Sequence, residues 1–276
     1  MIVTFYRYGR LGNRLFTFSN LIAFSELHKV PVMVPSFCEY RLFFPFFRDN
    51  PACAYGFGDD SRPGMAAAHA VRIAARIGLV PTVRFWQGRY VYFDRDDAGD
   101  PRVALMLRAP RVLFEGWDFC SRQAIQSFRG RIREVFTPQG RIIELVSARM
   151  APFRDRADIL VGVHVRWGDY RGTDRFFLLS EYMKRMQEVR ALLSPSKVAF
   201  LLFSPEKIPL EGLPEDSFVC SQDPIADLYS LAACDYLIGP PSTFSMWASY
   251  YGGHPLFVMQ PKEQFTEVSM ARIATP

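Results

Sequence analysis

Three side chains of the segment HVRWGDY, residues 164–170, have types and spacing that could do chemistry. The segment ends the most apolar strand-like run of the chain, and alternation along a strand would turn His164 and Arg166 to the same side. A guanidinium can hold a phosphate through two hydrogen bonds, and an imidazole can donate or accept one. Arg166 and His164 are therefore candidates for binding an anion. A structural ion pair between Arg166 and Asp169 explains the same residues equally well.

Two further segments have the composition of anion-binding turns. In residues 9–14, GRLGNR, the glycines would let the backbone approach a ligand, and the helix that follows would offer unpaired N–H groups. In residues 239–245, GPPSTFS, hydroxyl groups stand at a helix start in the same way. A plain glycine turn and an ordinary Ser242 cap are the alternatives. Asp227 lies in the first turn of a predicted helix, where a carboxylate ordinarily complements the helix dipole.

Metal and cofactor chemistry has little support in the sequence. Asp94 and Asp96 match the D-x-D pattern that can hold a divalent ion, but a solvated acidic loop explains the run DRDDAGDP better. Walker, G-x-S-x-G and H-E-x-x-H motifs are absent. The histidines are too scattered for a metal site: His28, His69, His164 and His254. We therefore expect no bound metal and no cofactor.

The hydrophobic pattern predicts a parallel α/β framework for these segments. In the first half, a strand at 2–6, a helix at 13–28 and a strand at 32–34 form a β-loop-α-β unit. The second half repeats this rhythm, with strands at 159–165, 198–203, 217–220, 236–239 and 255–259. A polar, proline-bearing stretch separates the halves. We expect two Rossmann-like domains facing a cleft, residues 1–155 and 156–276.

The remaining elements are shorter or less regular. Further helices are predicted at 65–78, 121–136, 141–150, 181–193, 223–234 and 242–251, and a strand at 112–115. Residues 36–64 predict a long surface loop. Its part RLFFPFFR, residues 41–48, has two explanations. Aromatic residues between arginines suit a membrane interface, and packing into the core is the better explanation.

The composition is that of a globular protein. The 276 residues carry 33 Lys and Arg against 28 Asp and Glu, a net charge of +5, and 49% are hydrophobic. These values exclude a disordered chain, a collagen-like repeat and a coiled coil. The charge is too small to indicate nucleic acid, and it suits an anionic small molecule or an anionic membrane surface. Five widely spaced cysteines and no visible leader favour a cytoplasmic protein, with peripheral contact at the inner face of the membrane as an alternative.

Taken together and in this order, the three segments resemble motifs of the inverting fucosyltransferases with a GT-B architecture. The resemblance is closest to the bacterial α-1,2-fucosyltransferase family, glycosyltransferase family 11. That family typically shows G-G-L-G-N-Q near its start, a central H-V-R-R-G-D-Y, and a late S-T-F-S-W-W after a C-D-x-x-I strand. The corresponding runs here are GRLGNR at 9–14, HVRWGDY at 164–170 and CDYLIGPPSTFSMW at 234–247. The resemblance spans nearly the whole chain.

The resemblance implies a role for each matching residue. Arg166 would contact the diphosphate of a GDP-sugar, the donor substrate, and Asp169 would act as general base or orient Arg166. His164 and Asp227 would contact the guanine. The phosphates would also be held by Ser242, Thr243 and Phe244. Gly12, Asn13 and Arg14 would contact the donor from the N-terminal half, which also forms the acceptor site. Transfer would invert the sugar through an oxocarbenium-like state, without a metal.

Three positions depart from the family pattern: Trp167 replaces the second Arg, Arg14 replaces Gln, and Met246 replaces the first Trp. We expect an inverting glycosyltransferase that moves fucose from GDP-fucose to an oligosaccharide or lipid-linked glycan during bacterial surface polysaccharide synthesis. One alternative is the same scaffold with another nucleotide sugar. The other, which Trp167 suggests, is a catalytically silent nucleotide- or glycan-binding protein.

Overall fold

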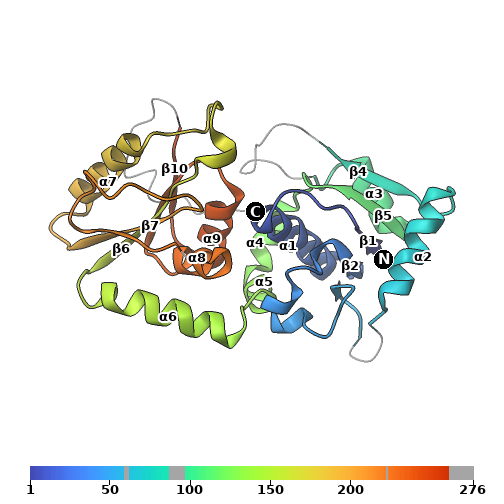
Figure 1. Cartoon of the computed structure of the whole chain (residues 1–276). Helices are drawn as coiled ribbons and strands as arrows, with labels where there is room; N and C mark the ends of the chain where they lie inside the picture. The colour runs from blue at the N-terminus through green and yellow to red at the C-terminus, as the bar shows by residue number, and fades with distance from the viewer. Residues whose placement is uncertain (59–61, 87–96, 222, 261–276) are drawn as a thin grey trace. The chain divides into compact units, whose positions relative to one another are not determined.

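The computed structural model describes residues 1–58, 62–86, 97–221 and 223–260. The chain divides into two compact units (Figure 1), with the boundary between Gln139 and Gly140. We predicted this boundary after residue 155. It lies earlier because helix α6 (Gly140–Arg154) groups with the second unit. There Arg149 bonds to α8 and Arg154 bonds to the turn that follows α8.

The first unit is built on a five-stranded sheet of order β3-β2-β1-β5-β4. Its strands are β1 (Ile2–Val3), β2 (Val32–Met33), β3 (Ala54–Tyr55), β4 (Thr82–Phe85) and β5 (Val112–Gly116). The pairs among β1, β2, β4 and β5 are parallel, as predicted, and β3 pairs antiparallel with β2. Its helices are α1 (Leu11–His28), α2 (Met65–Arg76), α3 (Pro101–Arg108), α4 (Arg122–Ser127) and α5 (Arg129–Val135).

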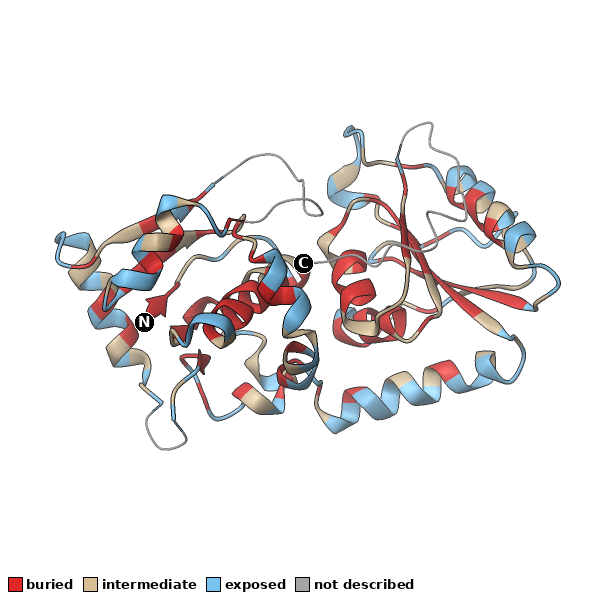
Figure 2. Ribbon diagram, turned by 180° about the vertical axis from the view of Figure 1, so that it is seen from behind, coloured by how far each residue is buried: buried red, intermediate tan, exposed pale blue. Residues whose placement is uncertain are grey.

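Phenylalanine rings fill part of the core of the first unit, between α1 and the turns after β2. The ring centroid of Phe18 in α1 lies 5.2 Å from that of Phe37 and 4.9 Å from that of Phe47. Phe44 and Phe47 are fully buried, and Phe136 joins the cluster at 5.6 Å from Phe18. The aromatic loop therefore packs into the core, and Figure 2 shows how much of α1 is buried.

The second unit holds a sheet of order β10-β9-β6-β7-β8, whose strand pairs are all parallel. Its strands are β6 (Ile159–His164), β7 (Val198–Phe203), β8 (Ser217–Val219), β9 (Tyr236–Gly239) and β10 (Leu256–Val258). Its other helices are α7 (Leu179–Leu193), α8 (Pro224–Ala232) and α9 (Thr243–Gly252). The predicted strands of this unit agree with the observed bounds to within one residue at either end.

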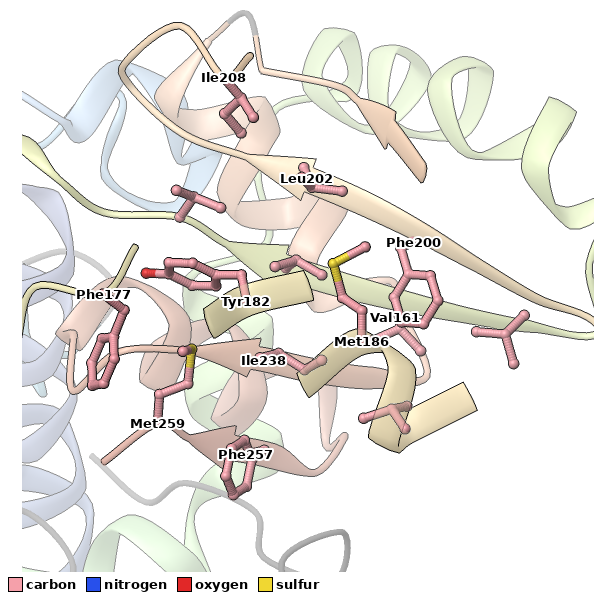
Figure 3. Packing of buried hydrophobic residues seen from close by; sticks show 14 of the residues in the cluster. Val161, Phe177, Tyr182, Met186, Phe200, Leu202, Ile208, Ile238, Phe257 and Met259 are labelled. Carbon is pink, nitrogen blue, oxygen red and sulfur yellow. The ribbon is translucent and has the colours of Figure 1, made fainter. Parts of the chain in front are cut away.

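Different helices cover the two faces of the second sheet. Val161 and Val163 lie in a buried cluster with residues of α7 (Figure 3). Gly162 faces the opposite side, where a Cβ atom would lie 2.8 Å from the side chain of Leu231 in α8. The missing side chain lets α8 pack close to the sheet. Because side chains alternate along a strand, His164 is turned to the same side as α8.

Three elements differ from the sequence predictions. β3 is only two residues long, too short for a visible alternation. α3 is preceded by its N-cap Asp100, whose side chain accepts the N–H of Arg102, and its first residue is a proline; we did not use this start signal. The helix predicted over 121–136 is divided into α4 and α5 at Phe128, shortly before Gly130, which disfavours a continuous helix. Within the described ranges, no helix is long and apolar enough to cross a membrane.

Candidate functional site

The order of the second sheet changes direction between β6 and β9. From β6 the chain builds outward through β7 and β8, and then crosses to the other side of β6 to add β9 and β10. In open α/β sheets, ligands bind at such a switch point, outside the carboxyl ends of the strands. His164 ends β6 and Gly239 ends the neighbouring β9. The two predicted segments 164–170 and 239–245 therefore meet at this point.

His164 is buried, and one of its ring nitrogens has no hydrogen-bond partner among the residues that the structure describes. The residue is 2% exposed, and Nδ1 makes no hydrogen bond with the described part of the chain. Burial, followed by the charge of Arg166, lowers the pKa of His164 to about 3, so the imidazole is neutral at neutral pH. Its ring centroid lies 5.1 Å from that of Phe244. A Cβ atom at Gly239 would lie 3.3 Å from the His164 Cβ, so the glycine makes room for the imidazole.

Arg166 is held in a fixed orientation by Asp169. Its Nε and Nη2 atoms each lie 2.9 Å from one carboxylate oxygen of Asp169. The Arg166 side chain is 16% exposed, whereas that of Asp169 is 57% exposed, so the guanidinium is the inner member of the pair. Burial opposes the charge of Arg166, but the hydrogen bonds that it donates to Asp169 raise its pKa overall. The ion pair that the sequence allowed is therefore present, and it leaves Arg166 charged and oriented.

The rest of the central segment is tied to the start of α9 and to the core. Tyr170, whose ring centroid lies 5.4 Å from the Arg166 guanidinium carbon, donates its hydroxyl hydrogen to the carbonyl of Pro241 at 2.9 Å. Trp167 is 9% exposed and belongs to the hydrophobic cluster of this unit. Its indole N–H donates to the carbonyl of Phe177 at 2.9 Å. The residue that replaces the second Arg of the family pattern is thus a core residue.

Helix α9 begins at the switch point. The hydroxyl oxygen of Ser242 accepts the backbone N–H of Phe244 at 3.3 Å, so Ser242 is the helix N-cap. Thr243 and Phe244 follow in the first turn and are half-buried. The first N–H groups of a helix have no partners within the helix and carry a positive partial charge. This turn is therefore suited to an anion, beside the fixed cation of Arg166.

A buried ion pair joins α6 to α8. Nη1 of Arg149 donates to Oδ1 of Asp227 at 2.8 Å and to the hydroxyl oxygen of Ser230 at 3.1 Å. The side chains of Arg149 and Asp227 are 9% and 11% exposed. Asp227 thus has a specific cationic partner in addition to its helix-dipole position. Nη2 of Arg149 is buried without a hydrogen-bond partner among the described residues.

The sequence analysis missed Arg149. Two neighbours on its helix, Ile142 and Met150, are buried, so Arg149 is a cation near an apolar stripe of α6. Such a position indicates a buried charge that needs a partner. That pattern was the available signal, since Arg149 belongs to none of the motifs.

The glycine turn of residues 9–14 lies in the first unit, after β1. Gly12 is buried in the first turn of α1, and Asn13 is half-buried. Arg14 is used within this unit, because its Nη1 atom donates to the Ser36 carbonyl at 2.6 Å and pairs with Glu39. These contacts tie α1 to the turn after β2. Gly12, Asn13 and Arg14 thus lie together at the start of α1 in the first unit.

Aromatic side chains follow the carboxyl ends of β1, β4 and β5, where the first sheet has its own switch point between β1 and β5. The rings of Tyr8 and Trp117 are nearly parallel at 4.6 Å, and those of Tyr6 and Trp86 are nearly perpendicular at 4.6 Å. Trp86 is 46% exposed. Gly116, with φ of +128°, lets a carbonyl of β4 accept the Trp117 N–H at 3.2 Å. The sequence analysis did not single out these rings.

The metal-ligating residue types are dispersed. Over the ranges that the structure describes, no group of three or more His, Cys, Asp or Glu side chains could hold a metal ion. Asp94 and Asp96 lie outside the described residues. The five cysteines are free thiols.

Comparison of the sequence with protein-family models and with curated proteins finds no match. The structure is similar to that of a mutant of Arabidopsis thaliana FUT1 in complex with GDP, with a TM-score of 0.58 and 14% identity, covering 98% of this chain and 73% of that chain. It is also similar to the structure of NodZ α-1,6-fucosyltransferase soaked with GDP-fucose, with a TM-score of 0.56 and 15% identity. This similarity covers 100% of this chain and 99% of that chain. For POFUT1 in complex with GDP-fucose, the TM-score is 0.52 and the identity is 12%. This similarity covers 91% of this chain and 93% of that chain. The predicted fold class, an α/β chain with two Rossmann-like sheets like those of GT-B fucosyltransferases, is confirmed.

Proposed function

We propose that this chain is an inverting glycosyltransferase that moves fucose from GDP-fucose to a hydroxyl group of a glycan. The observation that carries the proposal is the switch point of the second sheet, where His164, Arg166 and the start of α9 come together. The similar structures hold GDP or GDP-fucose, which favours a guanine nucleotide as donor. The α-1,2 linkage and a role in bacterial surface polysaccharide synthesis rest on the sequence resemblance alone.

In this proposal, catalysis consists mainly of stabilising the departing GDP. Negative charge grows on the β-phosphate as the sugar–phosphate bond breaks, and the sugar becomes oxocarbenium-like. Arg166 supplies a guanidinium that Asp169 has already oriented through Nε and Nη2, so the phosphate oxygens would bind at its Nη1 edge. The first turn of α9, with Ser242, Thr243 and Phe244, would supply hydroxyl and N–H donors. Asp169 acts as a positioning residue, because both of its oxygens face Arg166.

The guanine would lie on the α8 side of the second sheet. His164 is turned to that side and would form one hydrogen bond to the nucleotide through its neutral ring. Asp227 would accept hydrogen bonds from the N1–H and 2-amino groups of the base. Both groups are buried, which makes a hydrogen bond from each to a ligand stronger than it would be in water.

The acceptor would bind to the first unit. Tyr6, Tyr8, Trp86 and Trp117 offer aromatic surface at the carboxyl ends of the strands. One face of a pyranose ring carries mainly C–H groups, which pack against aromatic rings, while its hydroxyl groups bond to tyrosine and backbone groups.

A thermal-shift panel with GDP, UDP and GDP-fucose, each with and without EDTA, tests the proposal. GDP at 100 times its Kd should add about 2.7 kcal/mol of stability. GDP-fucose should behave similarly, UDP should have little effect, and EDTA should change none of these values. A preference for UDP would contradict the donor. Binding of GDP-fucose without hydrolysis or transfer to any glycan would indicate a catalytically silent binding protein.

A further inference from the structure

Among the described residues of the second unit, two buried side-chain nitrogen atoms have no hydrogen-bond partner. They are Nη2 of Arg149 and Nδ1 of His164, on side chains that are nine-tenths or more buried. Leaving a buried donor unsatisfied is unfavourable, and most buried polar groups in folded proteins have a hydrogen-bond partner. Burying the Nη2 donor of Arg149 without a hydrogen-bond partner is especially unfavourable because the guanidinium is charged. Both atoms are suited to meet a ligand.

Arg149 and His164 lie on the same face of the sheet. Gly162 packs against Leu231 of α8, and His164, two residues further along β6, is turned to the same side. Asp227, which holds Arg149, comes one helical turn before Leu231. The start of α8 follows β8, so this turn lies toward the carboxyl ends of the strands.

The surroundings of Cys220 support the position of Arg149 near the carboxyl ends of the strands. Cys220 directly follows β8, at the carboxyl end of the strand. Burial raises the pKa of its thiol to about 11, and the charges of Arg149 and Asp227 act on it from nearby. Arg149 therefore lies at the carboxyl edge of the sheet, which is the edge where a nucleotide would bind.

We infer that Arg149 is a specificity-determining residue that donates from Nη2 to the O6 carbonyl of a bound guanine. This inference rests on the proposed function, in which Asp227 accepts from N1–H and the 2-amino group of the same base. The Arg149–Asp227 pair then presents a donor beside an acceptor, which complements the carbonyl and N–H groups along that edge of guanine. Adenine carries an amino group and an unprotonated nitrogen at these positions, so both members of the pair would face the wrong partner.

The geometry of the ion pair explains why arginine suits this position. Nη1 is used by Asp227 and Ser230, and the planar guanidinium fixes the direction of Nη2 relative to them. A lysine would keep the positive charge beside Asp227 but would not offer a second donor in a fixed direction. Arg149→Lys therefore separates the contact with the base from the support of Asp227.

The test measures the affinity of GDP and of 6-thio-GDP for the wild-type chain and for Arg149→Lys. In 6-thio-GDP a sulfur atom, which is a weaker acceptor, replaces O6, while N1–H and the 2-amino group stay. The wild type should bind GDP more tightly than 6-thio-GDP. Arg149→Lys should bind GDP about ten- to a hundredfold more weakly than the wild type, and should bind the two nucleotides equally. Arg154→Lys, on the same helix with an ion pair to Asp235, is the matched control and should behave as wild type.

The outcomes separate the two proposals. If the wild type binds GDP but Arg149→Lys keeps the wild-type affinity and the same preference over 6-thio-GDP, Arg149 does not contact O6 and the inference is wrong, while the proposed function stands. If the wild type binds neither nucleotide, the proposed function itself fails. Melting curves without ligand verify that Arg149→Lys is folded. Should it be unfolded, the wild-type preference for GDP over 6-thio-GDP and over ADP tests the same contact, and the absence of both preferences overturns it.

Discussion

The guanidinium of Arg166 is oriented before any ligand arrives, because two of its nitrogens are bonded to Asp169. Preorganised donors of this kind stabilise developing charge without rearranging during the reaction. Burial strengthens the effect by excluding water from one side of the group. A phosphate would therefore meet a cation whose position the fold has already set.

We expect Arg166→Ala to lower the rate of sugar transfer by about 10²–10³-fold, the usual effect of removing one preorganised donor. Arg166→Lys should recover little of the rate, since a point charge cannot reproduce the planar fork. Steady-state kinetics measure both variants, with ligand-free melting curves to verify folding. Arg171→Ala, which removes an exposed cation close by, is the control. Near-wild-type transfer by Arg166→Ala would mean that the central segment is structural.

Asp227 needs a conservative substitution because it neutralises the buried Arg149. Asp227→Ala would leave that charge unpaired and should destabilise the fold by about 3–5 kcal/mol. Asp227→Asn retains an oxygen for Arg149, and its amide N–H groups would face the donors of guanine. We expect Asp227→Asn to fold and to bind GDP about ten- to a hundredfold more weakly, measured by calorimetry. Unchanged GDP affinity in the folded variant would show that the carboxylate serves only the ion pair.

At the scale of elements, glycine residues allow neighbouring helices and strands to approach one another closely. Gly162 allows α8 to pack on β6, and Gly239 makes room for His164 beside β9. Gly116 is the most constrained of these positions. Its φ of +128° is rare for other residues, and a Cβ atom there would lie 2.2 Å from the Phe85 carbonyl oxygen. The ends of β4 and β5 therefore depend on this residue.

We predict that Gly116→Ala destabilises the chain by about 1–3 kcal/mol, because the new methyl group must displace backbone and the left-handed conformation becomes strained. Gly130→Ala is the matched control, since Gly130 lies inside α5 and an added Cβ atom would meet open space. That change should raise stability by about 0.5–1 kcal/mol. Denaturant unfolding of both variants gives the comparison. Equal effects would contradict the constraint at Gly116.

At the scale of the whole molecule, the buried His164 makes stability depend on pH. In the unfolded chain its pKa is near 6.5, whereas burial and then Arg166 lower it to about 3 in the folded chain. Between these values the unfolded state binds more protons, so its population increases as pH falls. The contribution of His164 is complete above about pH 6.5 and is lost progressively toward pH 3.

We expect stability to decline by up to about 1.4 kcal/mol per pH unit from this residue as pH falls through that window. His164→Gln should remove that part of the slope, and His69→Gln, which changes an exposed imidazole, should leave it intact. Urea unfolding between about pH 4.5 and about pH 7.5, which covers the upper part of the linkage window and the range above it, measures the difference. Identical slopes for the wild type and His164→Gln would contradict the burial of a neutral imidazole.

The sequence by itself determined the parallel α/β order of strands and helices and the position of the central and late segments at strand ends. These features follow from neighbouring residues: apolar alternation, glycine and proline at turns, and cap residues at helix starts. The strands of the second unit were predicted to within one residue at either end for this reason.

Only the tertiary structure decided which distant side chains become partners. Arg149 and Asp227 are 78 positions apart, and Arg14 bonds to the turn after β2, 22 positions away. Trp167 could have faced the site or the core, and packing placed it in the core. A periodic pattern can indicate that a charge such as Arg149 is buried, but it does not indicate which residue is the partner. The choice of partner depends on how close whole elements approach and not on the preferences of adjacent residues.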